Sequence, residues 1–160
     1  MRSLKLVFTA IVVIWISGAL QQTLAPRIAI FGAMPDFLLI AVTCLGLFMT
    51  RWGGALNGFA CGIVQGALAG ANLASYAISR TLAGFVVGWL GVIELDRSYL
   101  LAVTVTVVST ICARLVFMFG APPPAIIPFL IATISMSVYN GLLAFPVYGL
   151  IKRILDPPAR

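Results

Sequence analysis

The sequence predicts an all-α integral membrane protein, a single domain of six transmembrane helices (residues 1–160) with both termini in the cytoplasm. Hydrophobic residues make up 62% of the chain and charged residues 9%, against about 45–50% and 25% in soluble domains. Apolar runs of about 20 residues, the length that crosses a membrane, recur along the whole chain. Basic residues gather at alternate ends of these runs. We expect spans at residues 4–23, 35–50, 53–71, 75–93, 98–119 and 125–155.

The first span, residues 4–23, follows the basic residues Arg2 and Lys5. A basic start before an apolar run can also be a cleavable secretory signal, and this alternative stays open. The apolar run is longer than a usual signal core, and Trp15 inside it suits a retained anchor. We therefore expect a permanent helix here.

The second span is short if it begins at Pro35, since proline favours the first helical position. The preceding residues 28–34 are apolar, so they either extend this helix or lie half-buried in the outer interface. Asp36 falls in the first turn of the span. We expect its carboxylate to accept hydrogen bonds from the free N–H groups of that turn and to oppose an outer arginine. The candidate arginines are Arg27, Arg80 and Arg114.

The third span carries a glycine at every fourth position: Gly54, Gly58, Gly62, Gly66 and Gly70. Each glycine costs a helix in water roughly 1 kcal/mol relative to alanine. In lipid, however, small residues let helix backbones approach closely. A column of period four turns about 40° per step around a helix. We therefore expect the central three glycines to share one close crossing, and the outer two to face other neighbours.

The two sides of this glycine column differ in character. Asn57, Cys61 and Gln65 lie on one side of it, and the apolar Phe59 and Ile63 lie on the other. In lipid, helices associate through small residues that allow close packing and through hydrogen bonds between polar side chains of different helices. The sequence therefore predicts that the side with Gln65 faces protein.

The fourth span repeats the spacing, with Arg80, Gly84 and Gly88 four residues apart. Short loops also tie it to the third span, so we expect the glycine contact within this chain rather than with a partner. Arg80, near the outer end, either snorkels to the headgroups or pairs inside the protein. Arg114 lies deeper, about two turns from the outer end of the fifth span. It is expected to have an interior partner, a partner protein or a phospholipid headgroup.

The residue inventory argues against catalysis. The chain contains no histidine, which excludes Ser-His and Cys-His nucleophilic sites and histidine-ligated zinc. Its acidic residues all fall at expected span ends, which disfavours a proton relay inside the membrane. These residues are Asp36, Glu94, Asp96 and Asp156. We expect neither an enzyme nor a cofactor or metal site.

The basic residues set the orientation. With the N-terminus inside, the cytoplasmic side receives most of the ten basic residues: Arg2, Lys5, Arg51, Arg97, Lys152, Arg153 and Arg160. The net charge of +6 is then explained by basic residues that orient the chain in the membrane. Because the charges are scattered along the chain, they do not form a nucleic-acid-binding patch.

Three stretches resemble the MreD family of six-span rod-shape-determining membrane proteins of bacteria. They are "PDFLLIAVTCLGLF" from Pro35, "GFACGIVQGALAGANLASYAISRTLAGFVVGWL" from Gly58 and "VYNGLLAFPVYGLIKRIL" from Val138. The last stretch is similar to the family's final helix, with its asparagine, tyrosine and basic pair at Asn140, Tyr148, Lys152 and Arg153. Family members often carry an acidic residue where this chain has Gln65. Gln65 can form hydrogen bonds at this position, but it cannot supply a charge.

The resemblance implies a non-catalytic scaffold or regulatory subunit of the elongasome, which builds lateral peptidoglycan and maintains rod shape at the bacterial inner membrane. The implied main partner is MreC, a protein with one span. Through MreC the subunit is linked to a class B penicillin-binding protein, to RodA and to MreB, and membrane lipids surround it. The residues that we expect to serve helix packing or partner binding are Gly58, Gly62, Gly66, Gln65, Gly84, Gly88, Asp36, Arg114 and Asn140.

The family's fold is similar to the substrate-binding S components of energy-coupling-factor vitamin transporters, so an S component is the alternative function. The loop "GAPPPA" at residues 120–125 offers such a transporter no recognition groups. The outer ends of the first four spans supply a small polar set: Gln21, Gln22, Arg27, Asp36, Asn72, Ser75, Tyr76 and Arg80. A pore, the third possibility, is disfavoured because no span carries a polar stripe along its length.

Overall fold

The computed structural model describes residues 2–30, 33–93 and 98–156, leaving aside the side chain of Arg2. These residues form six helices and no β-strand: α1 (Arg2–Thr23), α2 (Phe37–Gly46), α3 (Arg51–Ala69), α4 (Leu73–Val92), α5 (Tyr99–Gly120) and α6 (Ile126–Leu155). The all-α prediction is confirmed. Five of the helices lie within two residues of their expected bounds.

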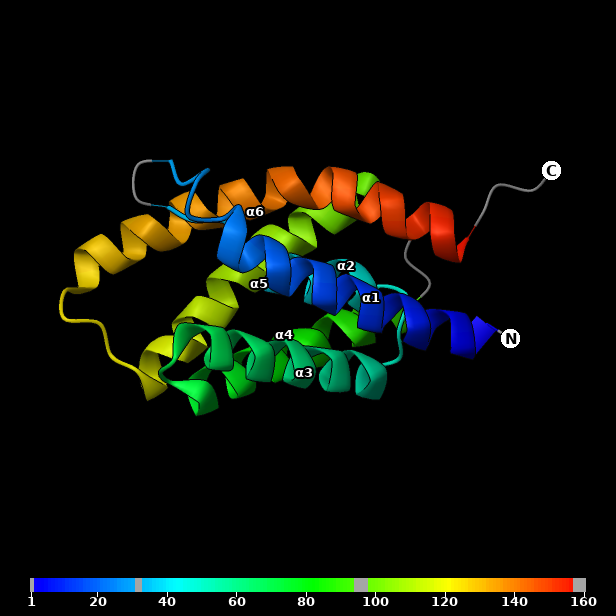
Figure 1. Ribbon diagram of the computed structural model, residues 1–160, viewed down its shortest axis with the longest axis horizontal. Helices are drawn as coiled ribbons and strands as arrows, with labels where there is room; N and C mark the ends of the chain where they lie inside the picture. Colours follow the sequence, from blue (N-terminus) through cyan, green and yellow to red (C-terminus); the bar gives the residue numbers. More distant parts are fainter. Residues whose placement is uncertain (1, 31–32, 94–97, 157–160) are drawn as a thin grey trace.

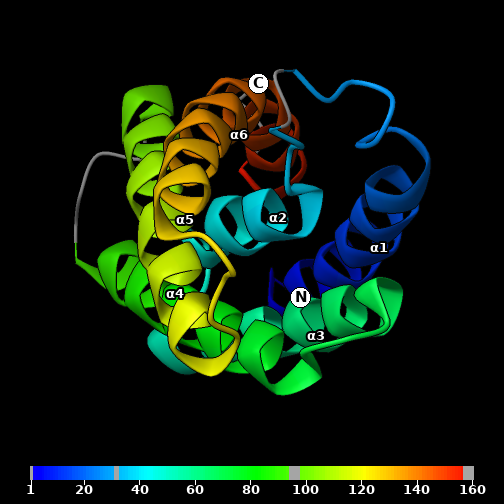
Figure 2. The same cartoon turned by 90° about the vertical axis from the view of Figure 1, so that its left-hand side faces the viewer.

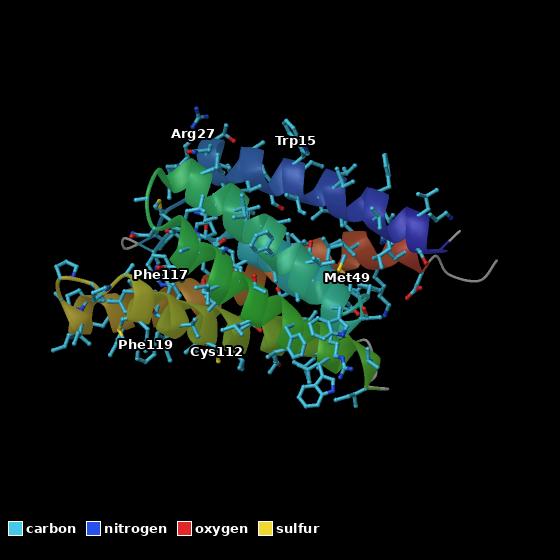
Figure 3. All side chains as sticks on the ribbon, turned by 90° about the horizontal axis from the view of Figure 1, so that it is seen from below. Trp15, Arg27, Met49, Cys112, Phe117 and Phe119 are labelled. Atoms are coloured by element: carbon cyan, nitrogen blue, oxygen red, sulfur yellow. The ribbon has the colours of Figure 1, made fainter. Side chains whose placement is uncertain are left out.

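Four helices of the described residues are long and apolar enough to cross a membrane: α1, α4, α5 and α6. Large apolar side chains such as Phe8, Trp15 and Leu142 are exposed on the outer faces of the bundle, and Figure 3 shows Trp15 pointing away from it. Such a surface suits lipid rather than water. The chain is therefore a membrane protein.

The second helix differs most from its expected bounds. α2 covers Phe37–Gly46 rather than residues 35–50. Ten residues of helix rise about 15 Å, half the thickness of a hydrocarbon core of about 30 Å. α2 therefore cannot cross a membrane alone. The described part of residues 28–34 does not extend this helix, because Ile30 and Ala33 pair through their backbones instead.

α2 is the core of the bundle. All ten of its residues are buried, and Figure 2 shows it enclosed by the other helices. The helix is apolar apart from Thr43, and a helix that is apolar all round is stable only when it is covered on every side. In this bundle α2 is covered by the other helices rather than by lipid.

α3 and α4 form the closest helix pair. A Cβ atom added to Gly62 would lie 2.6 Å from Ala77 Cα, and one added to Gly66 would lie 2.7 Å from Leu73 Cα. Real Cβ atoms do not approach backbone this closely, so only glycine allows the two backbones to touch. The expectation that the glycine contact lies within the chain is confirmed.

The two outer glycines of the column do not behave as expected. A Cβ on Gly54 would meet the carbonyl group of Gly84 in α4, just as one on Gly58 would meet that of Arg80. Gly54 therefore belongs to the same crossing, which means that α4 follows the drifting glycine column by coiling around α3. A Cβ added to Gly70 would meet nothing within 4 Å, and this residue adopts a φ of +66°. It ends α3 as a left-handed cap, a conformation that favours glycine.

The first helix is part of the bundle, and its side-chain hydrogen bonds to other elements lie near its C-terminal end. Gln21 Nε2 donates to Pro35 O at 3.2 Å, and Gln21 Oε1 accepts from the N–H of Phe37 at 2.8 Å. Gln22 Nε2 donates to Leu68 O of α3 at 3.2 Å. α1 begins and α6 ends at the same end of the bundle (Figure 1). We call the opposite end the distal end.

Candidate functional site

Asp36 organises the distal half of the bundle. It caps the N-terminus of α2, where its Oδ1 accepts from the N–H of Leu39 at 2.8 Å. Its Oδ2 forms an ion pair with Arg80 Nη2. The side chains of Asp36 and Arg80 are only 7% and 4% exposed. Of the three arginines considered from the sequence, Arg80 is therefore the partner, and it pairs inside the protein instead of snorkelling.

The described acidic residues stand at helix ends, as expected from the sequence. Asp36 precedes α2, and because α2 starts inside the bundle, its carboxylate is enclosed. Asp156 is the C-terminal cap residue of α6, and Glu94 and Asp96 lie outside the described residues.

Asn140 links this carboxylate site to α5 and α6. Its Oδ1 accepts from the backbone N–H of Asp36 at 2.9 Å, and its Nδ2 donates to Thr110 Oγ1 at 3.2 Å. One turn away, the hydroxyls of Thr43 and Thr106 lie 2.9 Å apart. These groups form a polar seam between α2, α5 and α6. The resemblance pointed to Asn140, whereas nothing in the sequence distinguished the threonines from ordinary packing residues.

Arg114 lies beside this ion pair and is half-buried. Its Nε donates to Thr133 Oγ1 of α6 at 3.4 Å. Its guanidinium carbon lies 4.4 Å from the centre of the Phe129 ring. Neither contact neutralises its charge.

A cavity of about 140 Å³ separates the two arginines. We call it the polar cavity. Every helix contributes to its lining, which includes Gln21, Leu39, Gln65, Tyr76, Arg80, Arg114 and Met136. Two of the lining residues, Gln65 and Arg80, each carry a buried polar atom, Oε1 and Nε, that has no hydrogen-bond partner in the described part of the chain. Buried polar groups are normally paired, so the cavity is suited to a polar ligand.

A second candidate is an outer groove between α1 and α3. It consists of two adjoining hollows of about 370 and 440 Å³ that share Ile14. We call it the α1–α3 groove. Small residues line it alongside larger apolar ones: Ala10, Gly18, Ala19 and Gly53. Asn57 also lines it, and although Asn57 is only 5% exposed, neither polar atom of its amide has a partner among the described residues.

The expected site residues thus fall into three separate places. The first place is the α3–α4 crossing, which contains Gly58, Gly62 and Gly66 of α3 and Gly84 and Gly88 of α4. Gln65, Asp36 and Arg114 line the polar cavity, and Asn140 braces it through Asp36. The polar flank of the glycine column divides, because Gln65 faces the cavity whereas Asn57 faces the groove.

Comparison of the chain with protein-family models, with curated proteins and with solved structures finds no match.

Proposed function

We propose that this chain is a non-catalytic membrane subunit of the bacterial elongasome that binds MreC and supports lateral peptidoglycan synthesis and rod shape. The proposal joins the resemblance of three sequence stretches to the MreD family with one structural observation. That observation is the α1–α3 groove, in which the buried amide of Asn57 is left without a partner.

The groove suits one transmembrane helix. Its lining on α1 runs from Leu6 to Thr23, which is about 26 Å at 1.5 Å per residue. That length approaches the hydrocarbon thickness of about 30 Å. Small residues on the groove walls allow a partner backbone to come close. The single span of MreC is therefore the proposed occupant.

Asn57 favours a helix over a lipid chain as the occupant. An unsatisfied amide in an apolar environment costs free energy, and an acyl chain offers neither a donor nor an acceptor. The amide atoms of Asn57 lie beneath the groove surface, so a rotation of this side chain would bring them to a polar side chain on a partner helix. Such a hydrogen bond contributes about 1–2 kcal/mol between model helices. The groove thus selects a partner span that carries such a side chain.

The same proposal sets the location and the orientation. We place the chain in the bacterial inner membrane as a six-span protein with its termini in the cytoplasm, where the positive-inside rule puts Lys5, Arg51, Lys152 and Arg153. The short α2 and its flanking residues then make up one of the six passes. Class B penicillin-binding protein, RodA and MreB are indirect partners, reached through MreC.

The polar cavity favours the alternative function, an S component of a vitamin transporter. It lies in the distal half and is lined by Gln21, Tyr76 and two arginines. Its volume of about 140 Å³ is below the roughly 300–1,000 Å³ of most small-molecule sites. We therefore rank the transporter second.

Depletion of the protein from the cell that encodes it separates the two functions. We expect depleted cells to lose their rod shape and to scatter lateral wall synthesis, because the elongasome loses a membrane subunit. Vitamin uptake should not change. Microscopy with a fluorescent wall precursor and uptake of labelled vitamins would be measured together. Normal shape combined with auxotrophy for one vitamin would contradict the proposal and establish the transporter.

A further inference from the structure

The polar cavity has an excess of positive charge. Arg80 and Arg114 both line it, and Asp36 is the acidic residue in its lining. Two guanidinium groups and one carboxylate leave a net charge of +1. The carboxylate is already occupied, since Oδ1 binds the N–H of Leu39 and Oδ2 pairs with Arg80. The charge of Arg114 is therefore left to be balanced by something else.

We propose that the polar cavity binds an oxyanion, a phosphate or carboxylate group. This inference goes beyond the proposed binding of MreC, because the cavity and the α1–α3 groove share no lining residue. Guanidinium groups match the geometry of such oxyanions and form strong, charge-assisted hydrogen bonds with them.

Arg80 carries a buried donor that has no partner among the described residues. Arg80 is 3% exposed, and its Nε has no partner while its Nη2 holds Asp36. Asp36 thus holds the guanidinium group through Nη2, and the Nε–H of Arg80 does not take part in this ion pair. The Tyr76 ring packs at a tilt against Phe117 with ring centres 4.6 Å apart, and it lies 4.8 Å from the Arg80 guanidinium carbon. The donor is held by its neighbours before any ligand arrives, which lowers the cost of binding.

Gln65 is the group that does not obviously suit an anion, because its unpaired buried atom is the acceptor Oε1. Two arrangements remove the conflict. A rotation of the amide by half a turn exchanges its oxygen and nitrogen, which are assigned only from their hydrogen bonds. Alternatively, a hydroxyl on the ligand donates to Oε1, as in a protonated phosphate or a glycerol headgroup.

The polar cavity is too large to be filled by a single water molecule. A water needs about 10–15 Å³ of such space, and the polar cavity has about 140 Å³. An adjoining hollow of about 130 Å³ shares Met34, Arg114 and Met136 with it and is completed by Ala33 and Ala132. An oxyanion attached to a lipid could place its apolar part there. A free phosphate would use the polar cavity alone.

The test uses the full chain, purified in a non-ionic detergent, and measures the thermal unfolding midpoint. One arm titrates inorganic phosphate against chloride at equal ionic strength. The other titrates a short-chain phosphatidylglycerol against the matching phosphatidylcholine. A ligand that binds only the folded state raises the midpoint in a saturable way. We expect at least one anion to do so, with phosphate indicating a free anion and phosphatidylglycerol alone indicating a lipid headgroup.

Arg114→Gln is the site variant, because Arg114 makes no ion pair among the described residues and its loss leaves the Asp36–Arg80 pair intact. We expect it to weaken the apparent affinity at least tenfold. Arg27→Gln removes the same charge from an exposed side chain that points away from the bundle (Figure 3), and it should bind like the wild type. If Arg114→Gln does not fold, Arg114→Lys, which loses the planar fork, takes its place. No saturable shift with either anion, or equal shifts in all variants, would overturn the proposal.

Discussion

Replacement of Gly58 by leucine is expected to abolish the folded bundle. The first added carbon would overlap the carbonyl group of Arg80, which is backbone and cannot rotate away. The two helices would have to separate along their whole contact. Overpacking of a core commonly costs about 1–3 kcal/mol and occasionally more, against a total stability of about 5–15 kcal/mol. The separation would also draw Arg80 away from Asp36, so we expect the larger cost.

The measurement is the fraction of monodisperse protein after purification, together with its thermal midpoint. Ala67→Leu is the matched control, because it adds bulk to an exposed position of the same helix, and it should leave both values unchanged. A Gly58→Leu protein that purifies and unfolds like the wild type would show that the glycine column has no packing role.

Replacement of Asp36 by asparagine is expected to cost about 3–5 kcal/mol, the usual effect of leaving one member of a buried ion pair uncompensated. Asparagine is also a good N-cap residue, so the loss of the charge dominates the effect. The pair is 7% and 4% exposed, and solvent screens it little. Asp36→Glu, which keeps the charge, should restore part of the loss.

A second variant separates the charge effect from a local disturbance of α2. In Asp36→Asn combined with Arg80→Met, neither charge remains, and such double replacements are often close to neutral. We expect the double variant to be more stable than Asp36→Asn alone, as measured by denaturant or thermal unfolding in detergent at pH 7. Purely additive losses in this double-mutant cycle would show that the two charges do not stabilise the bundle as a pair.

Local pattern was sufficient to predict the helices and the α3–α4 contact. Gly58, Gly62 and Gly66 repeat on one helix and Gly84 and Gly88 on the next, and short connections bring such neighbours together. Asp36 followed Pro35 at a helix start, so its capping role could also be predicted. In each case the signal lies within a few residues of sequence.

The enclosed position of α2 could not be predicted in the same way. A helix covered by lipid and a helix covered by protein are both apolar, so hydropathy does not separate them. The contacts that reveal the difference join distant residues: Asn140 bonds to the backbone of Asp36, 104 positions away. The polar cavity needs all six helices in place. Its lining residues are scattered singly along apolar spans, where each is indistinguishable from a snorkelling or packing residue.

Photo-cross-linking from the α1–α3 groove tests most directly whether a helix of MreC lies there. A photoreactive amino acid would replace Ile11, which lines the groove, or Ile131, which is 61% exposed on α6, in cells that also make MreC. Our model predicts a covalent adduct with MreC from position 11 and none from position 131. An adduct from position 131 without one from position 11, or no adduct from either position while the two proteins co-purify, would contradict it.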